Sequence, residues 1–430
     1  MRFFFTLCCI AYATLGFAQT PPTPAVDQTR PIAIQNAELH LGNGETIQRG
    51  TIVFDNGKIA AVGANVPVPA GAEVIDGAGK RVYPGLIACN TNLGLVDIGA
   101  VRATRDYAEV GGINPNVRAL IAFNTESNVI PTVRTNGILM AQITPQGGLV
   151  PGQSSIVQLD AWNWEDAAVR ADDGIHLNWP RIYSRSGWWA EPGGIERNKK
   201  YDENVRSIRE YFSEAAAYHA SERNDEANLK FEAMRGLFDG SKRLYVAADD
   251  AQAIVDAVNF AKSMGITPVL TGGSDSWLVA DFLKENGVGV IFQATQSLPA
   301  GDDADIDQPF KTPRQLHEAG VKFALSMDGY WQQRNLAFQA GQAVGFGLPY
   351  DIAVHALTGA AAELLGIGDR TGTLEVGKDA TLLLVPGDLL DMRTNKIERA
   401  FLMGRDVDLD TVQKQLYQKY GKKLEVSTEY

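Results

Sequence analysis

From residue 81 onward, apolar runs typical of buried strands alternate with segments whose apolar residues recur at helical spacing. Strands that are apolar on both faces and separated by helices are typical of parallel βα units. A succession of right-handed βα units closes naturally into a (β/α)8 barrel. We therefore predict an α/β protein in which residues 83–367 form a TIM-type barrel. The clearest runs are 243–248, 251–264, 267–270, 276–285, 288–292, 312–319 and 321–326.

Short strands and turns flank this region on both sides. The sequence Asp55-Asn56-Gly57, between apolar runs at 51–54 and 58–62, predicts a tight hairpin because Asn-Gly readily adopts positive φ. Strand and turn signals return at 370–385. A unit assembled from both chain ends brings the termini together. We predict a small composite β-sandwich built from residues 31–82 and 368–408, with a terminal helix and tail at 409–430.

The alternation is interrupted between residues 161 and 237. Five of the seven tryptophans lie there: Trp162, Trp164, Trp179, Trp188 and Trp189. The charged segment 204–237 predicts one long helix. The aromatic residues could form a wall that faces a ligand or a small satellite core. We expect the satellite core, because aromatic side chains mainly serve to bury area.

The first 18 residues have the pattern of a secretory signal peptide. Arg2 gives a short positive start, residues 3–17 are almost wholly apolar, and Gly16 and Ala18 are small residues before the expected cleavage site. An uncleaved membrane anchor is the alternative, but the apolar run is short for a span of about 20 residues. We expect export across the inner membrane, with a periplasmic location, and a proline-rich lead-in at residues 19–30.

The net charge limits the classes of partner, and the cysteine content limits the disulfides that the chain can form. The 430 residues carry a net charge of −12 without a basic block, which argues against nucleic acid and anionic membrane surfaces as partners. Cleavage of the signal peptide would leave Cys89 as the only cysteine, so the mature chain could form no internal disulfide. Cys89 lies in an apolar run, and we expect a small core residue rather than a nucleophile.

Several motifs together resemble the imidazolonepropionase-like branch of the amidohydrolase superfamily. They lie at 57–63, 74–76, 79–80, 84–87, 320–328, 355–358, 364–366 and 372–380. The resemblance covers most of residues 31–406 and is looser across 100–240. It implies a hydrolase of amide or other C–N bonds, cyclic or peptide-like, that uses zinc or a similar divalent ion to activate water and an aspartate to shuttle protons.

The chain departs from this family at the positions where histidines would bind the metal. The first barrel strand, expected within 83–94, carries Asn90 and Asn92 in place of a His-x-His pair. Asp249 follows the fifth strand, and Gly272 stands where the sixth strand would supply a histidine. Carboxamides are poor ligands for zinc, whereas imidazole is a good one. The family's terminal aspartate is present as Asp328.

No other residue offers an obvious replacement for the lost ligands. A middle strand would supply a bridging lysine or glutamate, but the nearest strand-like run carries only Gln158. The five histidines are His40, His176, His219, His317 and His355. We expect ordinary surface or core roles for them, with His176 as the one candidate in a loop near a pocket. Oxygen donors could instead bind Ca²⁺ or Mg²⁺, the donors being Asn90, Asn92, Asp249 and Asp328.

These observations lead to one favoured hypothesis and two alternatives. We expect an exported protein of the C–N hydrolase lineage that lacks the usual metal centre and is catalytically impaired. It would serve as a non-catalytic subunit beside an active amidohydrolase relative or as a binder of small amide or peptide-like ligands. Asp328 is the candidate catalytic residue, and Asn90, Asn92, Asp249 and Gly272 are candidate pocket residues. The alternatives are an active hydrolase with a non-standard site around Asp328, and a binding protein unrelated to hydrolysis. A homo-oligomer remains open.

Overall fold

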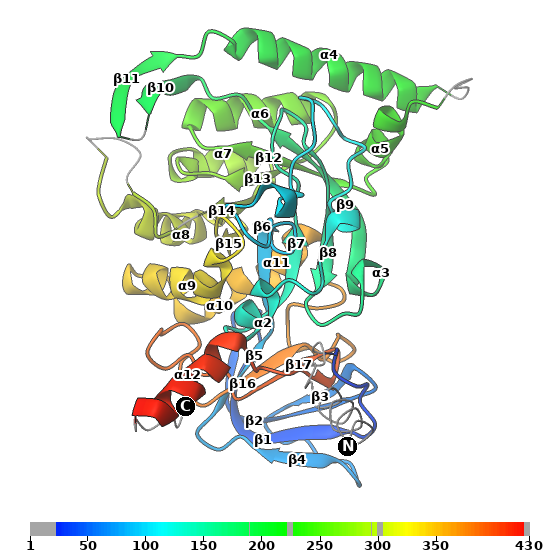
Figure 1. The fold of residues 1–430 in the computed structure, drawn as a ribbon, viewed down its shortest axis with the longest axis vertical. Coiled ribbons are helices and arrows are strands. Elements are labelled where there is room, and N and C mark those ends of the chain that lie inside the picture. The colour runs from blue at the N-terminus through cyan, green and yellow to red at the C-terminus, as the bar shows by residue number, and fades with distance from the viewer. Residues whose placement is uncertain (1–22, 189, 222–226, 294, 299–303, 425–430) are drawn as a thin grey trace, which may run out of the picture.

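The computed structural model describes residues 23–424, apart from 189, 222–226, 294 and 299–303. The predicted signal peptide lies outside this part of the chain. The described residues form two units, a barrel and a smaller β-sheet that packs beside one end of it (Figure 1). Within the described residues, no helix is long and apolar enough to cross a bilayer.

The smaller unit, called the sheet unit below, is one continuous sheet assembled from both ends of the chain. Its order is β18-β17-β16-β5-β1-β2-β3, and β4 pairs with β1. The strands are β1 Ile32–His40, β2 Thr46–Asp55, β3 Lys58–Gly63, β4 Glu73–Asp76, β5 Arg81–Pro84, β16 Leu382–Val385, β17 Arg399–Leu402 and β18 Arg405–Asp406. Side chains from both chain ends, including Ile34, Phe54, Leu382 and Phe401, form one core. The predicted hairpin is confirmed, with Asn56 and Gly57 both at positive φ.

The larger unit is the predicted (β/α)8-type barrel. Its strand order is β15-β14-β13-β12-β9-β8-β7-β6, and β15 lies against β6, which nearly closes the ring. The strands are β6 Leu86–Thr91, β7 Ile138–Ile143, β8 Gly152–Gln158, β9 Ala168–Asn178, β12 Arg243–Ala248, β13 Val269–Gly272, β14 Gly289–Gln293 and β15 Phe323–Ser326. Strand β8 runs antiparallel to both of its neighbours, β7 and β9. The other hydrogen-bonded pairs of neighbouring barrel strands are parallel.

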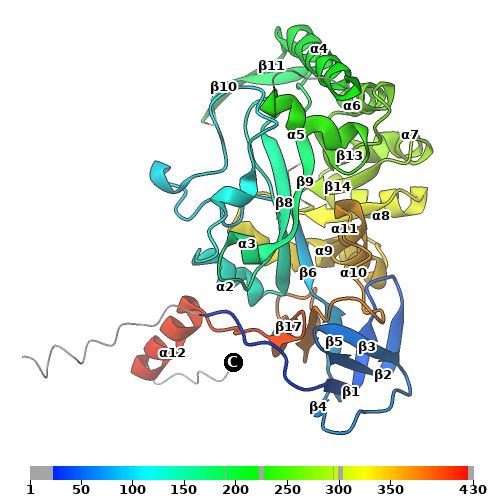
Figure 2. The ribbon, with the colours of Figure 1, turned by 90° about the vertical axis from the view of Figure 1, so that its right-hand side faces the viewer.

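Helices cover the outside of the barrel and close one end of it (Figure 2). They are α2 Val129–Arg134, α3 Trp164–Ala167, α4 Tyr201–Ala220, α5 Leu229–Phe238, α6 Ala251–Ser263, α7 Ala280–Glu285, α8 Gln308–Ala319, α9 Leu336–Gly345, α10 Tyr350–Leu357 and α11 Gly359–Leu365. The last helix, α12 Val412–Leu424, stands apart from the barrel. Leu364 of α11 packs where β14 begins, against Gly289. Because α11 occupies the end at which the parallel strands begin, the open mouth is the end at which they finish.

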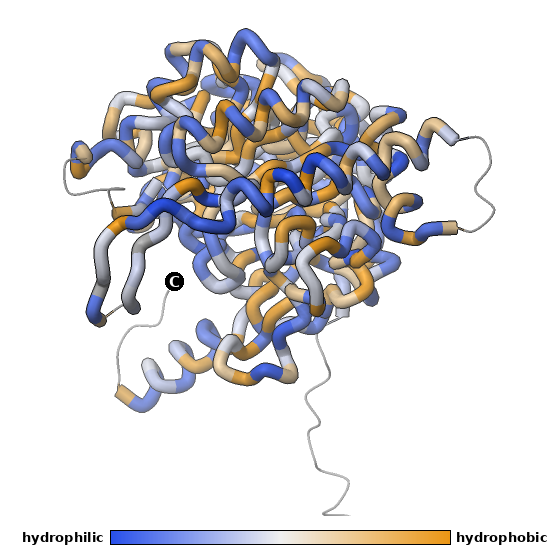
Figure 3. Tube along the Cα trace, turned by 90° about the horizontal axis from the view of Figure 1, so that it is seen from above, coloured by the Kyte–Doolittle hydropathy of each residue, from blue (hydrophilic) through white to orange (hydrophobic). Residues whose placement is uncertain are grey.

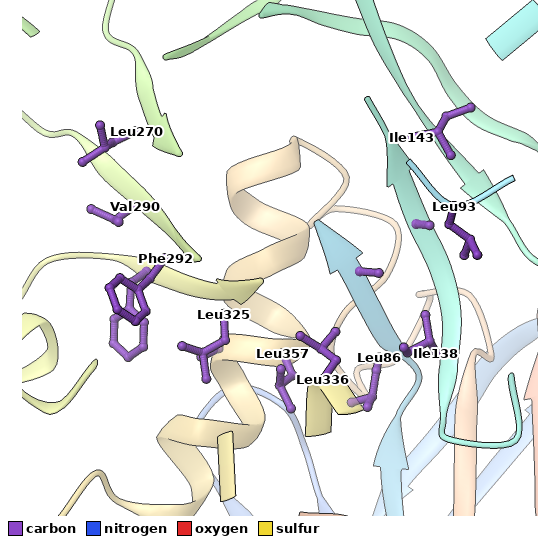
Figure 4. Packing of buried hydrophobic residues seen from close by; sticks show 14 of the residues in the cluster. Leu86, Leu93, Ile138, Ile143, Leu270, Val290, Phe292, Leu325, Leu336 and Leu357 are labelled. Atoms are coloured by element: carbon purple, nitrogen blue, oxygen red, sulfur yellow. The ribbon is translucent and has the colours of Figure 1, made fainter. Parts of the chain in front are cut away.

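Two sets of apolar side chains hold the barrel together. Inward-facing residues from seven strands, such as Ile87, Cys89 and Met140, form a cluster with α11. Outward-facing residues such as Leu86, Leu270 and Leu325 belong to the larger cluster with the surrounding helices (Figure 4). Cys89 is fully buried, and burial raises the pKa of its thiol to about 12, so the prediction of a core residue is confirmed.

The insertion between β9 and β12 differs from the prediction. The charged segment forms two helices, α4 and α5, instead of one. The tryptophans do not gather in a satellite core: Trp179 packs on Phe260 in the main core, while Trp162 and Trp188 are more than half exposed. Trp189 lies outside the described residues. Trp188 belongs to a two-stranded sheet of β10 Tyr183–Trp188 and β11 Glu191–Arg197 that extends beside the mouth.

Candidate functional site

A cavity of about 450 Å³ lies at the mouth of the barrel, where the loops that follow four consecutive strands meet. We call it the mouth pocket. Its described lining residues are Asp249, Ser274, Asp275, Trp277, Phe292, Gln293, Ser297, Leu298, Ala304, Asp305, Gln308, Pro309 and Asp328. Asp249 follows β12, Asp275 follows β13, Gln293 ends β14 and Asp328 follows β15. The carboxyl ends of barrel strands are where such folds place their functional residues.

The structure brings two of the predicted site residues, Asp249 and Gly272, into contact. The amide and hydroxyl of Ser274 both donate to Oδ1 of Asp249, at 3.4 and 3.1 Å. Gly272 has φ +88°, and a Cβ there would lie 2.7 Å from the same carboxylate oxygen. Gly272 therefore does not line the pocket itself. It lets the chain turn at the end of β13 and leaves room for the carboxylate of Asp249.

Asp328 lies at the other side of the mouth pocket. Its Oδ1 accepts a hydrogen bond from the side-chain amide of Gln293 on the neighbouring strand. Partial enclosure by the pocket and the negative charge of Asp249 both raise the pKa of Asp328. The effect of Asp249 on Asp328 indicates that the two carboxylates are close enough to repel each other.

The same repulsion extends to two further aspartates beside the pocket. Burial is the main cause of a raised pKa for Asp250 and for Asp275, and the charge of Asp249 adds to it in both. Asp305 differs, because a hydrogen bond from Lys311 lowers its pKa. Among the described lining residues of the mouth pocket there is no lysine, arginine or histidine. The pocket is therefore strongly acidic.

Asn90 and Asn92 do not line the mouth pocket. Asn90, at φ +51°, ends the regular part of β6, and its backbone N–H donates to Oε1 of Gln142 at 3.1 Å. Asn92 is 7% exposed, and its Oδ1 has no hydrogen-bond partner within the described residues. Of the four oxygen donors expected for a Ca²⁺ or Mg²⁺ site, only Asp249 and Asp328 are among the described lining residues of the mouth pocket.

Gln158 lies at the wrong end of the barrel for a ligand position. Because β8 runs antiparallel to its neighbours, its last residue lies at the closed end. There the side chain of Gln158 accepts a hydrogen bond from Arg405 and donates to the carbonyl of Asp166. The sequence pattern located the strand correctly but not its direction.

His176 was predicted to lie in a loop, and this prediction is wrong. It lies within β9 and is 4% exposed. Its ring stacks on that of Tyr245 with 4.8 Å between the centroids, and burial lowers its pKa to about 3. The imidazole is therefore neutral at physiological pH, and its Nε2 has no partner within the described residues.

A hydrogen-bonded network that the sequence did not indicate lies next to His176. The buried carboxylate of Asp173 accepts from the Tyr245 hydroxyl at 2.6 Å, from Ser154 Oγ at 2.7 Å and from the Gln142 amide at 3.1 Å. Burial raises the pKa of Asp173 despite these donors. Because every member comes from a different strand, the network ties β7, β8, β9 and β12 together beneath the mouth.

The side chains present do not fit a zinc ion. Within the described part of the chain, no group of three or more His, Cys, Asp or Glu residues is placed to share a metal. Zinc in proteins is bound mainly by imidazole and thiolate, and no such group lines the mouth pocket. The remaining histidines lie elsewhere: His40 in β1, His219 in α4, His317 in α8 and His355 in α10.

Most lining residues of the mouth pocket were not among the sequence candidates, and Asp275, Trp277 and Gln293 are three of them. Asp275 and Trp277 follow the glycine pair at 272–273, and Gln293 is the last residue of β14. Gln293 ends an apolar strand, and Asp275 and Trp277 lie within five residues of the end of another. The position at a strand end was the signal that could have identified them, because functional side chains of barrels gather there.

Comparison with known proteins gives a consistent result. Residues 202–415 match the family model described as Amidohydrolase family. The chain is 27% identical over 368 residues to an imidazolonepropionase of Mesorhizobium japonicum, covering 79% of this chain and 86% of the relative. It is 23% identical over 385 residues to a dihydroorotase of Mycobacterium bovis, covering 81% and 87%. An amidohydrolase structure from Thermotoga maritima is similar with a TM-score of 0.76 and 23% identity, covering 88% of this chain and 99% of that chain.

The structural similarity shows that the fold is a barrel with a companion sheet. Residues 202–415, just under half of the chain, are similar to the amidohydrolase family. Imidazolonepropionases and dihydroorotases are among its sequence relatives, at low identity.

Proposed function

We propose that this protein binds a small amide or peptide-like ligand in the mouth pocket and lacks the metal centre that would hydrolyse it. The amidohydrolase match and the relatives named imidazolonepropionase and dihydroorotase support descent from hydrolases of C–N bonds. The observation that carries the proposal is the donor set at the strand ends. It offers carboxylates and carboxamides where a zinc site needs several nitrogen ligands.

The pocket favours a ligand with a positively charged or N–H-rich group. Asp249, Asp275 and Asp328 take part in no ion pair within the described residues, so their oxygens can accept hydrogen bonds from a ligand. Trp277 and Phe292 add aromatic surface, which also attracts cations. A volume of about 450 Å³ suits a molecule the size of a dipeptide or a cyclic amide.

Calorimetric titration of the purified chain tests this proposal. The probes are dipeptides with a free amino terminus and the same dipeptides with that amine acetylated. We expect binding of the free form and about tenfold to a hundredfold weaker binding of the acetylated form, which lacks the charge-assisted hydrogen bonds. The variants Asp249→Asn and Asp328→Asn should lose this discrimination. Glu318→Gln, on the outer face of α8, serves as a matched control and should retain it.

Turnover measurements separate the proposal from its alternative. With Zn²⁺ or Mn²⁺ added, dipeptides and cyclic amides should not be hydrolysed above the rate of a contaminant control. The alternative is an active hydrolase in which Asp328 acts as acid or base, and its raised pKa favours that role. Turnover that falls at least about a hundredfold in Asp328→Asn would support the alternative and overturn the proposal.

We also propose export to the periplasm and association with an active amidohydrolase relative. The signal-like residues 1–18 support export, and a pocket without a metal centre is compatible with a non-catalytic subunit. Terminal sequencing of the exported protein should begin at Gln19. Affinity purification from the native host should recover an amidohydrolase relative in stoichiometric amount, and that relative should retain the metal-binding histidines. Recovery of the chain alone would exclude the subunit role and leave the ligand-binding role.

A further inference from the structure

Helix α12 carries an apolar surface that nothing in the described structure covers. Four apolar residues follow one another at four-residue spacing, which places them along one side of the helix. They are Val412, Leu416, Tyr420 and Leu424, with exposed fractions of 56%, 44%, 51% and 67%. We call them the apolar stripe. In an ordinary surface helix, such residues would face the core.

The side of α12 next to the apolar stripe faces the body of the protein. Gly421 is the only buried residue of the helix. Gln413, Lys414, Tyr417 and Gln418 line a cavity shared with α2 and the loop before β17. The hydroxyl of Thr132 donates to Gln413, and the ammonium group of Lys414 donates to the carbonyl of Leu409. The helix thus contacts the body of the protein mainly through polar residues, whereas the four residues of the stripe are exposed. Helix α12 lies at the periphery of the molecule (Figures 2 and 3).

The charge of α12 is opposite to that of the whole protein. Between residues 412 and 424 there are four lysines and no acidic residue, whereas the chain has a net charge of −12. Lys419, Lys422 and Lys423 are exposed and lie beside the apolar stripe. A helix with an apolar side bordered by lysines is typical of segments that lie in the interface of a bilayer.

We propose that α12 binds the surface of a bilayer that contains anionic phospholipid. The apolar stripe enters the boundary between headgroups and acyl chains, and the lysines contact the lipid phosphates. Each lysine near such a surface adds to the attraction, and the stripe adds buried apolar area. The net charge predicted no affinity for anionic membranes, but that charge averages over the chain and does not describe this helix.

A second copy of the chain fits the stripe less well. Two copies of α12 that paired symmetrically would bring four lysines of each helix close together, and like charges repel. Four side chains also provide much less area than the roughly 800 Å² per partner of a stable protein interface. An anionic bilayer carries negative charge that complements the lysines. It also offers an apolar phase that, unlike a protein interface, requires no minimum buried area.

Vesicle co-sedimentation of the full chain tests the proposal. Vesicles of phosphatidylcholine alone are compared with vesicles that also contain phosphatidylglycerol. We expect binding only to the second kind, weakened by salt because the attraction is partly electrostatic. Every variant carries the same N-terminal segment, so differences between variants report on α12.

Two pairs of variants identify the contacts. Lys422→Glu with Lys423→Glu should weaken binding at least about tenfold, as should Leu416→Ser with Leu424→Ser. The matched controls are Lys199→Glu with Lys200→Glu, which lie before α4, and Leu229→Ser on α5, which is 70% exposed. These controls should bind like the parent, with unchanged thermal unfolding in all variants.

Three results would overturn the proposal. The first is equal binding by the α12 variants and the parent, and the second is no binding to anionic vesicles at low salt. The third is a change of oligomeric state in the stripe variants, measured by light scattering without lipid, which would assign the stripe to a second copy instead.

Discussion

At the scale of single residues, the mouth pocket is defined by Asp249 and the neighbouring carboxyls whose pKa values its charge raises. Asp249 contributes to the raised pKa of Asp250, Asp275 and Asp328. A carboxyl whose pKa is higher in the folded than in the unfolded state binds protons more strongly when folded. Folding stability therefore falls as the pH rises from about 4, the unfolded value, through the folded-state pKa values. The acidic pocket reduces stability at neutral pH, which is typical of a site retained for binding.

Neutralising Asp249 should therefore stabilise the protein. We expect Asp249→Asn to raise Tm by a few degrees at pH 7 and to make less difference as the pH falls toward 4, because protonation of the carboxyls removes their mutual repulsion. Thermal unfolding followed by circular dichroism over this pH range measures the effect. Asp391→Asn serves as the control, because the pKa of Asp391 is lowered by Arg393 and its neutralisation should not stabilise. A lower Tm for Asp249→Asn at pH 7 would contradict the account.

His176 should affect stability in the opposite pH direction. Its pKa is about 3 in the folded state and about 6.5 when unfolded, so the unfolded chain takes up a proton first as the pH falls. Between pH 6.5 and 3 this histidine should cost about 1.4 kcal/mol of stability per pH unit. Denaturant unfolding of His176→Phe, which preserves the stack on Tyr245, should show a shallower acid-side loss than the parent. An identical slope for His176→Phe and the parent would show that the imidazole of His176 is accessible to protons in the folded state. His317→Gln is the control and should leave the slope unchanged.

The residues of the site were only partly predictable from the sequence. Asp328 and Asp249 stand at strand ends, and position alone identified them. Asn90 and Asn92 stand at a strand end too, but neither is among the described lining residues of the mouth pocket. Asp173 is out of reach of pattern reasoning, because its place in the barrel interior depends on Asp172 at φ +50°, which shifts the register between β8 and β9.

At the scale of elements, the turn after β13 positions the site. Gly272 combines a positive φ with close approach to the carboxylate of Asp249. A side chain at this position would strain the backbone and displace that carboxylate as well.

We expect Gly272→Ala to cost about 1–3 kcal/mol of unfolding free energy and to weaken ligand binding. Gly265→Ala is the matched control, since Gly265 has a similar φ of +76° but nothing within 4 Å of its Cβ position. Denaturant titration and calorimetry measure both effects. If the two variants lose the same stability and the same affinity, the contact with Asp249 has no role.

The elements themselves were largely predictable, and their directions were not. The hydrophobic pattern located β12, β14 and β15 as short continuous apolar runs, and α6 by its helical spacing. β8 is buried along its whole length, so its sequence contains no signal for the direction of the strand. The segment 204–237 has helical spacing on both sides of residues 221–228, which is why one helix was predicted where two are present.

At the scale of the whole molecule, buried ion pairs join the sheet unit to the barrel. Asp160, 5% exposed, follows β8 at the closed end of the barrel. It pairs with Arg134 of α2 and with Arg405 of β18, and it also accepts from the backbone of Ala25 at 2.9 Å. One side chain thus connects both chain ends to the barrel.

Removal of this carboxylate should be costly. We expect Asp160→Ala to lower the free energy of unfolding by about 3–5 kcal/mol, because two arginines then lie buried without a counter-charge. Chemical denaturation monitored separately by tryptophan fluorescence, which reports on the barrel, and by circular dichroism measures the loss. Asp55→Ala, in the exposed hairpin turn, should have little effect. A cost below about 1 kcal/mol would show that the units are joined mainly by apolar contacts.

The architecture was the most predictable property of this chain. Alternating strands and helices determine a barrel, and turn-rich ends determine a separate sheet, because few folds satisfy those patterns. The function was less predictable, because it depends on a few side chains at the strand ends. No hydrophobic periodicity restricts the residue type at those positions.

The most direct test of the central claim is titration of the purified, chelator-treated protein with Zn²⁺ by calorimetry. The account predicts no stoichiometric site with a binding free energy in the range of about 10–16 kcal/mol that structural zinc sites reach. A one-to-one site of that strength, lost in Asp249→Asn or Asp328→Asn, would contradict it and establish a metal centre at the mouth of the barrel.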